Sequence, residues 1–259
     1  MTRIGITGAS GFIGIHLTLF LSGRVANDIE MVPFPHAAFN DKKILEGLVS
    51  SCDTLIHLAG TNKGTAEDIH NGNVELARKL VDACRETSAK PHVIFTSSIY
   101  ADISSITVPH ERSLVFGPAK KAAEDLFLIW EKEAGALVTI LRLPHVFGEL
   151  AQPFSNSVVA TFCHQLARNE ASVVNPDAVV ELVYVGEVIS HLYRAVIKRV
   201  RGEVSIMGGY MSVKTLYGHL KNFADMYRAG TIPQPADSLE TALLLTLHAH
   251  ILFFDDRFI

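Results

Sequence analysis

The residues TGASGFIG at 7–14 decide the fold of this chain. They follow a short β-branched run at 3–7, and an apolar pattern with helical spacing continues over 12–21. A strand, a glycine-rich turn and a helix in this order are typical of the first unit of a dinucleotide-binding sheet. The stretch therefore predicts a strand–loop–helix unit that binds a dinucleotide.

The three glycines of this stretch are spaced G-x-x-G-x-x-G. Gly8 permits a tight turn, Gly11 lets the backbone approach a pyrophosphate, and Gly14 lets the helix pack closely on the strand. The N-terminus of the helix then offers N–H groups and a partial positive charge to the phosphates. Because strand, spacing and helix agree, we favour this interpretation over an ordinary glycine turn.

Strand-like apolar runs alternate with helical patterns along the first 150 residues. The strand-like runs are 3–7, 29–34, 54–60, 92–98 and 137–143, and the helical patterns are 12–21, 45–49, 73–86 and 120–133. Such alternation implies parallel strands joined by right-handed crossovers. The predicted fold is α/β, a Rossmann-type doubly wound parallel sheet. Only about 18 residues separate Pro35 from Asp53, which leaves little room for a further strand between them.

The alternation weakens after Gly148. A helix is expected at 156–169, a strand leading into a helix at 181–188, and a further helix at 213–226. We therefore predict a dinucleotide-binding domain at 1–150 and a smaller, mostly helical lobe at 151–259 that is interleaved with it. Ligands of open α/β sheets bind outside the carboxyl ends of the strands, so this lobe is expected to bind the substrate.

The composition argues against several classes of protein. A net charge of −4 over 259 residues gives no electrostatic footprint for nucleic acid or an anionic membrane. Three cysteines without CxxC spacing, and no apolar leader after a basic start, predict a cytoplasmic location. The apolar run at 242–254 has 13 residues, fewer than the roughly 20 that span a bilayer, and predicts a buried helix. HExxH and GxSxG motifs are absent, so neither metal catalysis nor a hydrolase is expected.

The end of the second strand bears on the choice of coenzyme. An acidic residue there would hold the adenosine ribose of NAD, but the sequence reads PFPH at 33–36. Without a carboxylate, a 2′-phosphate meets no repulsion, so NADP is favoured and NAD remains an alternative. His36 either donates to that phosphate or is an ordinary loop histidine.

Further motifs extend the pattern beyond the glycine loop. They are DTLIHLAG (53–60), Asn73-Val74, FTSS (95–98), FGPAK (116–120) and LRLPHVFG (141–148). With TGASGFIG, they make residues 1 to about 190 resemble the extended short-chain dehydrogenase/reductase family of NAD(P)-dependent nucleotide-sugar epimerases, dehydratases and ketoreductases. NSVVATFCHQLARNE (156–170) is similar to a narrower branch, the capsular-polysaccharide reductases of UDP-2-acetamido-2,6-dideoxy-4-keto sugars.

This resemblance implies roles for individual residues and a homodimer. Ser98 would hydrogen-bond the substrate carbonyl, Lys120 would hold the nicotinamide ribose, and Phe116 takes the place of the family's catalytic tyrosine. The implied coenzyme contacts are Gly8, Ser10, Gly11, Phe12, Ile13, Gly14, His36, Leu58, Ala59, Gly60, Asn73, Lys120 and Leu143. The implied substrate contacts are Ser98, His145, Asn156 and Arg168.

Plainer roles stay open for several of these residues. Ser98 could cap the end of a strand, and Asn156 could be the N-cap of a helix. Arg142 and Arg168 could bind a pyrophosphate or form ion pairs. His57, in an apolar strand, is expected to be a core histidine.

Phe116 keeps an aromatic ring at the tyrosine position but has no proton to give. Positions 116 and 120 share one helical face, so Lys120 would lie beside a hydroxyl there. One hypothesis is an NADP-dependent enzyme that reduces or epimerises a nucleotide-linked 4-keto-6-deoxy sugar, UDP-linked by preference, in surface polysaccharide biosynthesis. Its proton would come from water or from Tyr100. The other is a non-catalytic NAD(P)-binding sensor or scaffold protein.

Overall fold

The computed structural model describes residues 1–23, 29–102, 111–155 and 157–254. The chain divides into two compact units. The first unit comprises Met1–Leu143 and Ile189–Ile206, and the second comprises Pro144–Val188 and Met207–Ile259.

The first unit is built on a six-stranded sheet in the order β2-β1-β3-β4-β5-β8. Each neighbouring pair of strands is parallel. The strands are β1 (Thr2–Thr7), β2 (Ile29–Val32), β3 (Thr54–His57), β4 (His92–Ser98), β5 (Val138–Leu143) and β8 (Gly202–Ser205). The helices are α1 (Phe12–Ser22), α2 (Lys42–Ser51), α3 (Ala66–Thr87) and α4 (Glu111–Ala134), with the 3₁₀ turns η1 (His36–Asn40) and η2 (Ile99–Ala101) and part of α6 (Val185–Lys198).

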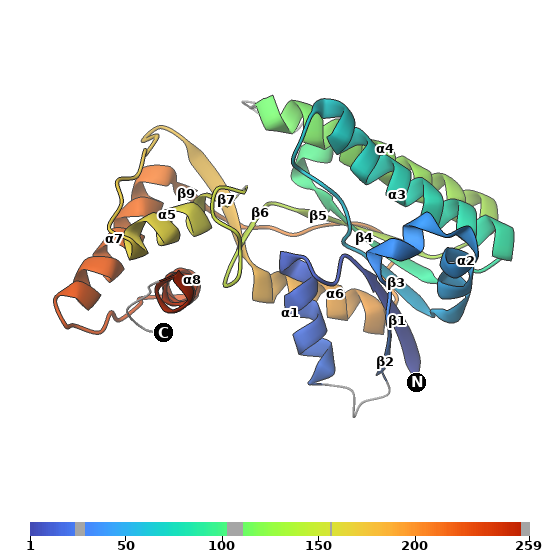
Figure 1. Ribbon diagram of the computed structural model, residues 1–259, viewed down its shortest axis with the longest axis horizontal. Helices are drawn as coiled ribbons and strands as arrows, with labels where there is room; N and C mark the ends of the chain where they lie inside the picture. The colour runs from blue at the N-terminus through green and yellow to red at the C-terminus, as the bar shows by residue number, and fades with distance from the viewer. Residues whose placement is uncertain (24–28, 103–110, 156, 255–259) are drawn as a thin grey trace. The chain divides into compact units, whose positions relative to one another are not determined.

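Helices cover both faces of this sheet. Helices α2, α3 and α4 lie on one face, and α1 lies with α6 on the other (Figure 1). The core under α3 and α4 includes the fully buried Phe95, Phe127 and Trp130. On the opposite face, the rings of Phe20 and Tyr193 pack edge to face with centroids 5.3 Å apart. The predicted Rossmann-type doubly wound parallel sheet is therefore confirmed.

The strand order places a topological switch point beside β1. Strand β1 lies between β2 and β3, so the connections that leave these strands run to opposite sides. In open α/β sheets the crevice at the carboxyl ends of such strands binds ligands. Residues 33–53 form η1 and α2 and contain no strand, as the short span predicted.

Two helices begin earlier than the sequence pattern predicted. Helix α3 starts at Ala66, because Thr65 and Asp68 form a capping box in which each side chain accepts from the other residue's backbone N–H. Helix α4 starts at Glu111 and continues through Pro118, where the pattern had suggested a start near Lys120. The proline removes one helical hydrogen bond, and its acceptor belongs to the exposed Leu114, where water can replace it.

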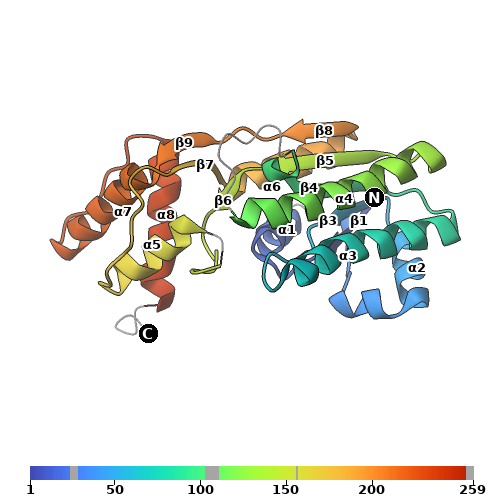
Figure 2. The ribbon, with the colours of Figure 1, turned by 90° about the horizontal axis from the view of Figure 1, so that it is seen from above.

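The second unit contains a three-stranded sheet and three helices. Strand β6 (His145–Phe147) pairs parallel with β7 (Val179–Tyr184), which pairs antiparallel with β9 (Gly209–Ser212). Helices α5 (Val158–Ala167), α7 (Val213–Arg228) and α8 (Ser238–Phe254) lie on one face of this sheet (Figure 2). These helices were predicted, whereas the short strands β6 and β9 were not. Among the described residues, none of the helices combines the length and the apolar character needed to cross a membrane.

Buried histidines make the fold sensitive to acid. Burial lowers the pKa of His57 to about 3, helped by the nearby charge of Lys120, and burial lowers the pKa of His92 and His250 to about 4. Unfolded histidines titrate near pH 6.5, so below that pH the unfolded chain binds protons that the folded chain does not. We expect the free energy of unfolding to fall from pH 7 to pH 5, with His57 alone contributing about 1.4 kcal/mol per pH unit once unfolded histidines are protonated.

Urea unfolding followed by circular dichroism at half-unit steps of pH measures this loss. An unchanged midpoint between pH 7 and pH 5 would contradict it.

Candidate active site

The glycine loop joins the end of β1, the start of α1 and the end of β3. Gly8 has φ of 74°, a left-handed conformation that glycine adopts without strain, and a Cβ on it would lie 2.7 Å from the backbone nitrogen of Ala59. A Cβ on Gly14 would lie 2.2 Å from the carbonyl oxygen of Gly8. Both glycines are therefore needed for backbone packing, Gly14 against the loop itself rather than against the strand.

Gly11 lies at the open side of this loop. It is exposed and is the N-cap of α1, with no side chain to cap the helix. Among the described residues, a Cβ there would meet only the carbonyl oxygen of Gly8, at 3.2 Å. Ser10 is also exposed, while Phe12 and Ile13 are half-buried in the first turn of α1. The first turn of α1 is thus accessible as an anion-binding helix end.

Thr7 and His57 tie the ends of β1 and β3 together. The hydroxyl of Thr7 lies 2.6 Å from Nδ1 of His57 and accepts from the backbone N–H of Ala59 at 3.3 Å. The His57 ring is fully buried and stacks on Phe95 with centroids 5.5 Å apart. His57 is therefore a core histidine, although its Nε2 has no hydrogen-bond partner among the described residues.

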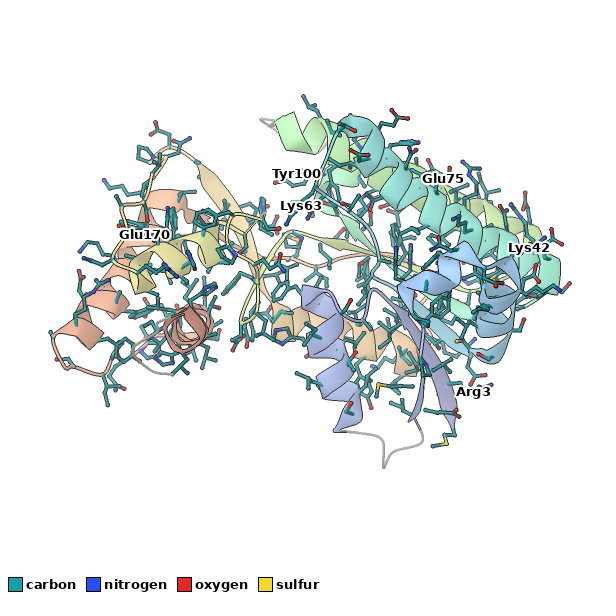
Figure 3. The ribbon with its side chains drawn as sticks, viewed as in Figure 1. Arg3, Lys42, Lys63, Glu75, Tyr100 and Glu170 are labelled. Atoms are coloured by element: carbon teal, nitrogen blue, oxygen red, sulfur yellow. The ribbon has the colours of Figure 1, made fainter. Side chains whose placement is uncertain are left out.

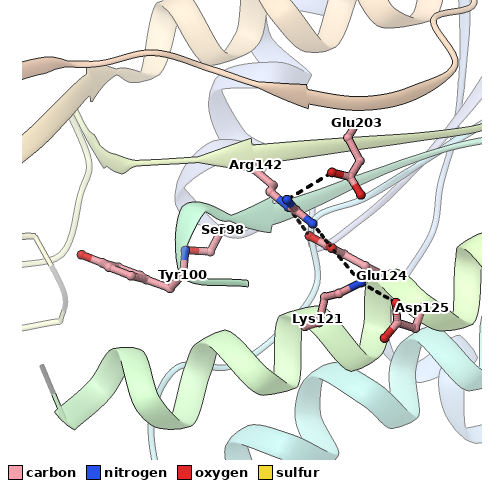
Figure 4. A network of polar contacts seen from close by, with 7 residues as sticks. All are labelled: Ser98, Tyr100, Lys121, Glu124, Asp125, Arg142 and Glu203. Atoms are coloured by element: carbon pink, nitrogen blue, oxygen red, sulfur yellow. Dashed lines mark hydrogen bonds and ion pairs between the residues drawn. The ribbon is translucent and has the colours of Figure 1, made fainter. Parts of the chain in front are cut away.

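Ser98 ends β4, beside Leu143 at the end of β5. Its buried hydroxyl accepts from the backbone N–H of Tyr100 at 3.2 Å, which caps the turn η2. Figure 3 places Tyr100 and Lys63, which follow β4 and β3, at the same end of the first unit. In Figure 4 the Tyr100 ring points away from Ser98, so the two hydroxyls do not converge.

Gly117 lets helix α4 approach this turn closely. A Cβ on Gly117 would lie 2.1 Å from the carbonyl oxygen of Tyr100. The glycine of FGPAK therefore allows the close contact between α4 and η2, the turn that follows Ser98. The motif was recognised from the sequence, but this role of its glycine was not.

Lys120 is the buried cation of the site. Its side chain reaches across to β4, where Nζ donates to the carbonyl oxygen of Thr96 at 3.0 Å. Nζ lies 4.7 Å from the ring centroid of Phe95 and 5.6 Å from that of Phe116. Burial lowers the pKa of Lys120 to about 8, against the opposing effect of the Glu124 carboxylate. The structure thus brings Phe116 and Lys120 together as the helical spacing predicted.

Gly60 and Asn73 adjoin the same cation. A Cβ on Gly60 would lie 2.4 Å from Oδ1 of Asn73 and 3.6 Å from Nζ of Lys120. Asn73 is buried, and its amide nitrogen donates to the carbonyl oxygens of Thr61 and Ile69. Its Oδ1 is buried and has no partner among the described residues. Glycine at position 60 therefore lets the buried Asn73 amide and the Lys120 ammonium pack close to the backbone that follows β3.

Glu124 is a site residue that sequence reasoning missed. It is fully buried one helical turn after Lys120, and both its oxygens accept from Arg142, at 3.0 and 2.7 Å. Arg142 also pairs with Glu203 at 3.1 Å (Figure 4). Both carboxylates raise the pKa of Arg142, and the hydrogen bonds to Glu124 are the largest cause. Arg142 therefore forms an ion pair, one of its two predicted alternatives. The spacing of Lys120 and Glu124 on one helix face was the signal available in the sequence.

The remaining predicted residues lie elsewhere. His36 is exposed at the start of η1, just past the end of β2. His145 begins β6 in the second unit, and Arg168 caps α5 there and pairs with Glu170 at 3.3 Å. Asn156 lies outside the described residues. Within the described part of the chain, no group of three or more His, Cys, Asp or Glu side chains could hold a metal ion.

Comparison with known proteins adds relatives that share this architecture. The chain is 31% identical over 249 residues to a UDP-2-acetamido-2,6-beta-L-arabino-hexul-4-ose reductase of Pseudomonas aeruginosa. The matched region covers 94% of this chain and 63% of the reductase. The crystal structure of the capsular polysaccharide assembling protein CapF from Staphylococcus aureus matches with a TM-score of 0.78 at 26% identity, over 96% of this chain and 65% of CapF. The chain thus spans less than two thirds of either relative.

A third structure shares the fold over nearly its whole length. RMD of Pseudomonas aeruginosa, solved with NADPH, matches with a TM-score of 0.80 at 20% identity, over 97% of this chain and 99% of RMD. The model of the NAD dependent epimerase/dehydratase family matches residues 4–207, which include every part of the site in the first unit up to β8. This chain is therefore a member of the NAD dependent epimerase/dehydratase family.

Proposed function

We propose that the chain is an NADP-dependent reductase, or epimerase, of a UDP-linked 4-keto-6-deoxy sugar in surface polysaccharide biosynthesis. The observation that carries the proposal is the buried Lys120 ammonium, which donates to the Thr96 carbonyl of β4 and lies, like Oδ1 of Asn73, within 4 Å of the place where a Cβ on Gly60 would be. The reductase relative supports the sugar class, because its name describes reduction of a UDP-linked hexulose at position 4. The absence of a carboxylate at the end of β2 supports NADP over NAD.

The residues present fit a nicotinamide dinucleotide. Gly8 to Gly14 would hold its pyrophosphate at the end of α1, Leu58 to Gly60 would line the adenosine side, and Lys120 with Asn73 would hold the nicotinamide ribose. When bound, the reduced coenzyme supplies hydride to a ketone carbon. His36 and Leu143 complete the proposed contacts.

The chain's own residues would bind and polarise the ketone. Because Oγ of Ser98 accepts from the Tyr100 N–H, its own hydrogen can be donated to a carbonyl oxygen. We propose that the second unit binds the nucleotide sugar through His145, Asn156 and Arg168. The homodimer that the family resemblance implies stays a prediction.

One feature favours a second candidate function. Phe116 removes the phenolic proton donor while keeping the ring, which is compatible with a protein that binds NADP without turnover, as a sensor or a scaffold. The two functions share the coenzyme site and differ in the ability to reduce a ketone.

Calorimetry and a reductase assay test the proposal. We expect NADPH to bind more tightly than NADH, and NADPH absorbance to fall only when a UDP-linked 4-keto-6-deoxy sugar is added, with UDP-glucose, which has no ketone, as control. Binding without turnover would favour the sensor. No affinity for either coenzyme would exclude both functions.

A further inference from the structure

Glu124 is a buried carboxylate that takes no part in the proposed coenzyme contacts. Its side chain is fully buried on α4, one helical turn after Lys120. Side chains four positions apart lie on one helix face, and a lysine and a glutamate at this spacing commonly form an ion pair. Such a pair would draw Nζ of Lys120 along α4 and away from β4.

The structure shows a different pairing. Nζ of Lys120 donates to the carbonyl oxygen of Thr96 at 3.0 Å. Both carboxylate oxygens of Glu124 accept from Arg142 of β5, Oε1 from Nε and Oε2 from Nη2 (Figure 4). Two such hydrogen bonds from one guanidinium are among the strongest contacts that a carboxylate makes. Glu124 is thereby committed to β5 rather than to the lysine on its own helix face.

Arg142 is also held from its other side. Its Nη1 pairs with Glu203 of β8 at 3.1 Å, and its side chain is largely buried. The guanidinium always carries its charge and is more weakly hydrated than an ammonium, so it suits a buried ion pair. Lys121 lies farther from the Glu124 carboxylate, with Nζ 3.9 Å from Oε2, and pairs with Asp125 at 2.5 Å. Arg142 is therefore the cation that holds Glu124.

We propose that Arg142 is a positioning residue for Lys120: by holding the Glu124 carboxylate, it keeps Nζ of Lys120 on the Thr96 carbonyl of β4. The inference rests on the proposed function, in which the ammonium in this position holds the nicotinamide ribose. Arg142 would act through Glu124 and Lys120, without touching coenzyme or substrate. A buried carboxylate is costly to leave unpaired, so Glu124 released from Arg142 would take the cation on its own helix face.

A double-mutant cycle on Arg142 and Glu124 tests the proposal. Methionine replaces each residue, because its unbranched, adaptable side chain fills the space without a charge. In Arg142→Met we expect Glu124 to capture Lys120 and the Kd for NADPH, measured by calorimetry, to rise about 10-fold, the scale of one lost hydrogen bond to a charged group. In Arg142→Met with Glu124→Met the carboxylate is gone, Lys120 returns to Thr96, and most of the affinity is regained.

A purely structural role for the Arg142–Glu124 pair predicts the opposite result. If the pair only held α4 on β5, the double variant would bind NADPH no better than Arg142→Met, and that outcome would overturn the proposal. Lys121→Met is the matched control, since it removes a neighbouring cation and leaves Glu124 bound to Arg142. It should bind NADPH as the original chain does, and melting temperatures show that each variant is folded during the titration.

The pKa of Lys120 gives a second readout that needs no coenzyme. Burial lowers this pKa to about 8, and the Glu124 carboxylate opposes the shift. The nearby His57 stays neutral in this range, because its pKa is about 3. In protein labelled with ¹³C-lysine, the resonance of Lys120 is the one missing from Lys120→Met. We expect its pKa to rise in Arg142→Met, where the carboxylate pairs with it, and to fall in Glu124→Met, where the opposing charge is lost.

Opposite shifts in the two single variants are the signature of the proposal. A loosened α4 that exposed Lys120 would raise its pKa in both variants, because burial no longer lowers it, and that result would overturn the proposal. Glu124→Met decides the matter alone if Arg142→Met does not fold.

The failure of this inference differs from failure of the proposed function. NADPH affinity that is unchanged in a folded Arg142→Met would overturn the inference and leave the function standing. No NADPH binding by the original chain would exclude the function, and the titration of Lys120 would still decide whether Arg142 withholds Glu124 from it.

Discussion

Replacing Phe116 by tyrosine is expected to raise the rate of ketone reduction by about 10²-fold or more. The ring position is already prepared: Phe116 is half-buried on the face of α4 that carries Lys120, with Nζ 5.6 Å from its centroid. The added hydroxyl would be a phenol beside an ammonium, which lowers the pKa of the phenol and makes it a better acid near neutral pH.

Stopped-flow measurement of NADPH oxidation with a UDP-linked 4-keto-6-deoxy sugar checks this result. Phe116→Leu is the matched control, because it removes the ring without adding a hydroxyl and is not expected to raise the rate. Affinity for NADPH should change little in the tyrosine variant, since the glycine loop is untouched. Absence of turnover in both the original chain and Phe116→Tyr, with intact NADPH binding, would contradict the reductase function and favour the sensor.

Gly14→Val is expected to weaken NADPH binding by at least about 10²-fold. A β-carbon here would lie 2.2 Å from the Gly8 oxygen and 2.7 Å from the Ala9 α-carbon, and backbone atoms cannot give way as the end of a flexible side chain can. Helix α1 must therefore move away from the loop, which separates its N–H groups from the pyrophosphate. Each 1.4 kcal/mol lost in binding is a tenfold change in Kd, so a loss of about 3 kcal/mol suffices.

Calorimetric titration with NADPH measures this loss. The matched control is Gly23→Ala at the other end of the same helix, where φ is −67° and the nearest atom to an added β-carbon is 3.6 Å away. It should bind NADPH as the original chain does. If Gly14→Val kept full affinity while Gly23→Ala also did, the glycine loop would not be the pyrophosphate site.

The fold of the first unit could be read from local patterns because parallel strands buried on both faces are continuous apolar runs. β3 and β4 are buried at every position, and their runs were identified in the right order. The starts of α3 and α4 were missed for different reasons. A capping box at Thr65 starts α3 earlier than the apolar pattern suggests. Helix α4 continues through Pro118, because the hydrogen bond that this proline removes lies at an exposed turn.

The candidate site was predictable only in part. The spacing of Gly8 and Gly14 predicts a phosphate-binding loop, and the spacing of Phe116 and Lys120 predicts one helix face, whereas Ser98 is assigned to the same site through the family resemblance. The long-range contacts around the site could not be predicted in this way, because a contact between residues far apart in the chain leaves no local signature. The hydrogen bond between Thr7 and His57 joins residues 50 positions apart. The two hydrogen bonds from Arg142 to Glu124 join β5 to α4.

By itself, the sequence determined the order of the first five strands and the helices between them, the glycine turn at 7–14 and the shared helix face of Phe116 and Lys120, since each depends on neighbouring residues and their spacing. Only the tertiary structure decided that Lys120 is buried against Phe95, and that its Nζ and Oδ1 of Asn73 both lie within 4 Å of the place where a Cβ on Gly60 would be. The pKa of that amine depends on desolvation, and desolvation is set by the packing of several elements around one atom, which no single stretch of chain encodes.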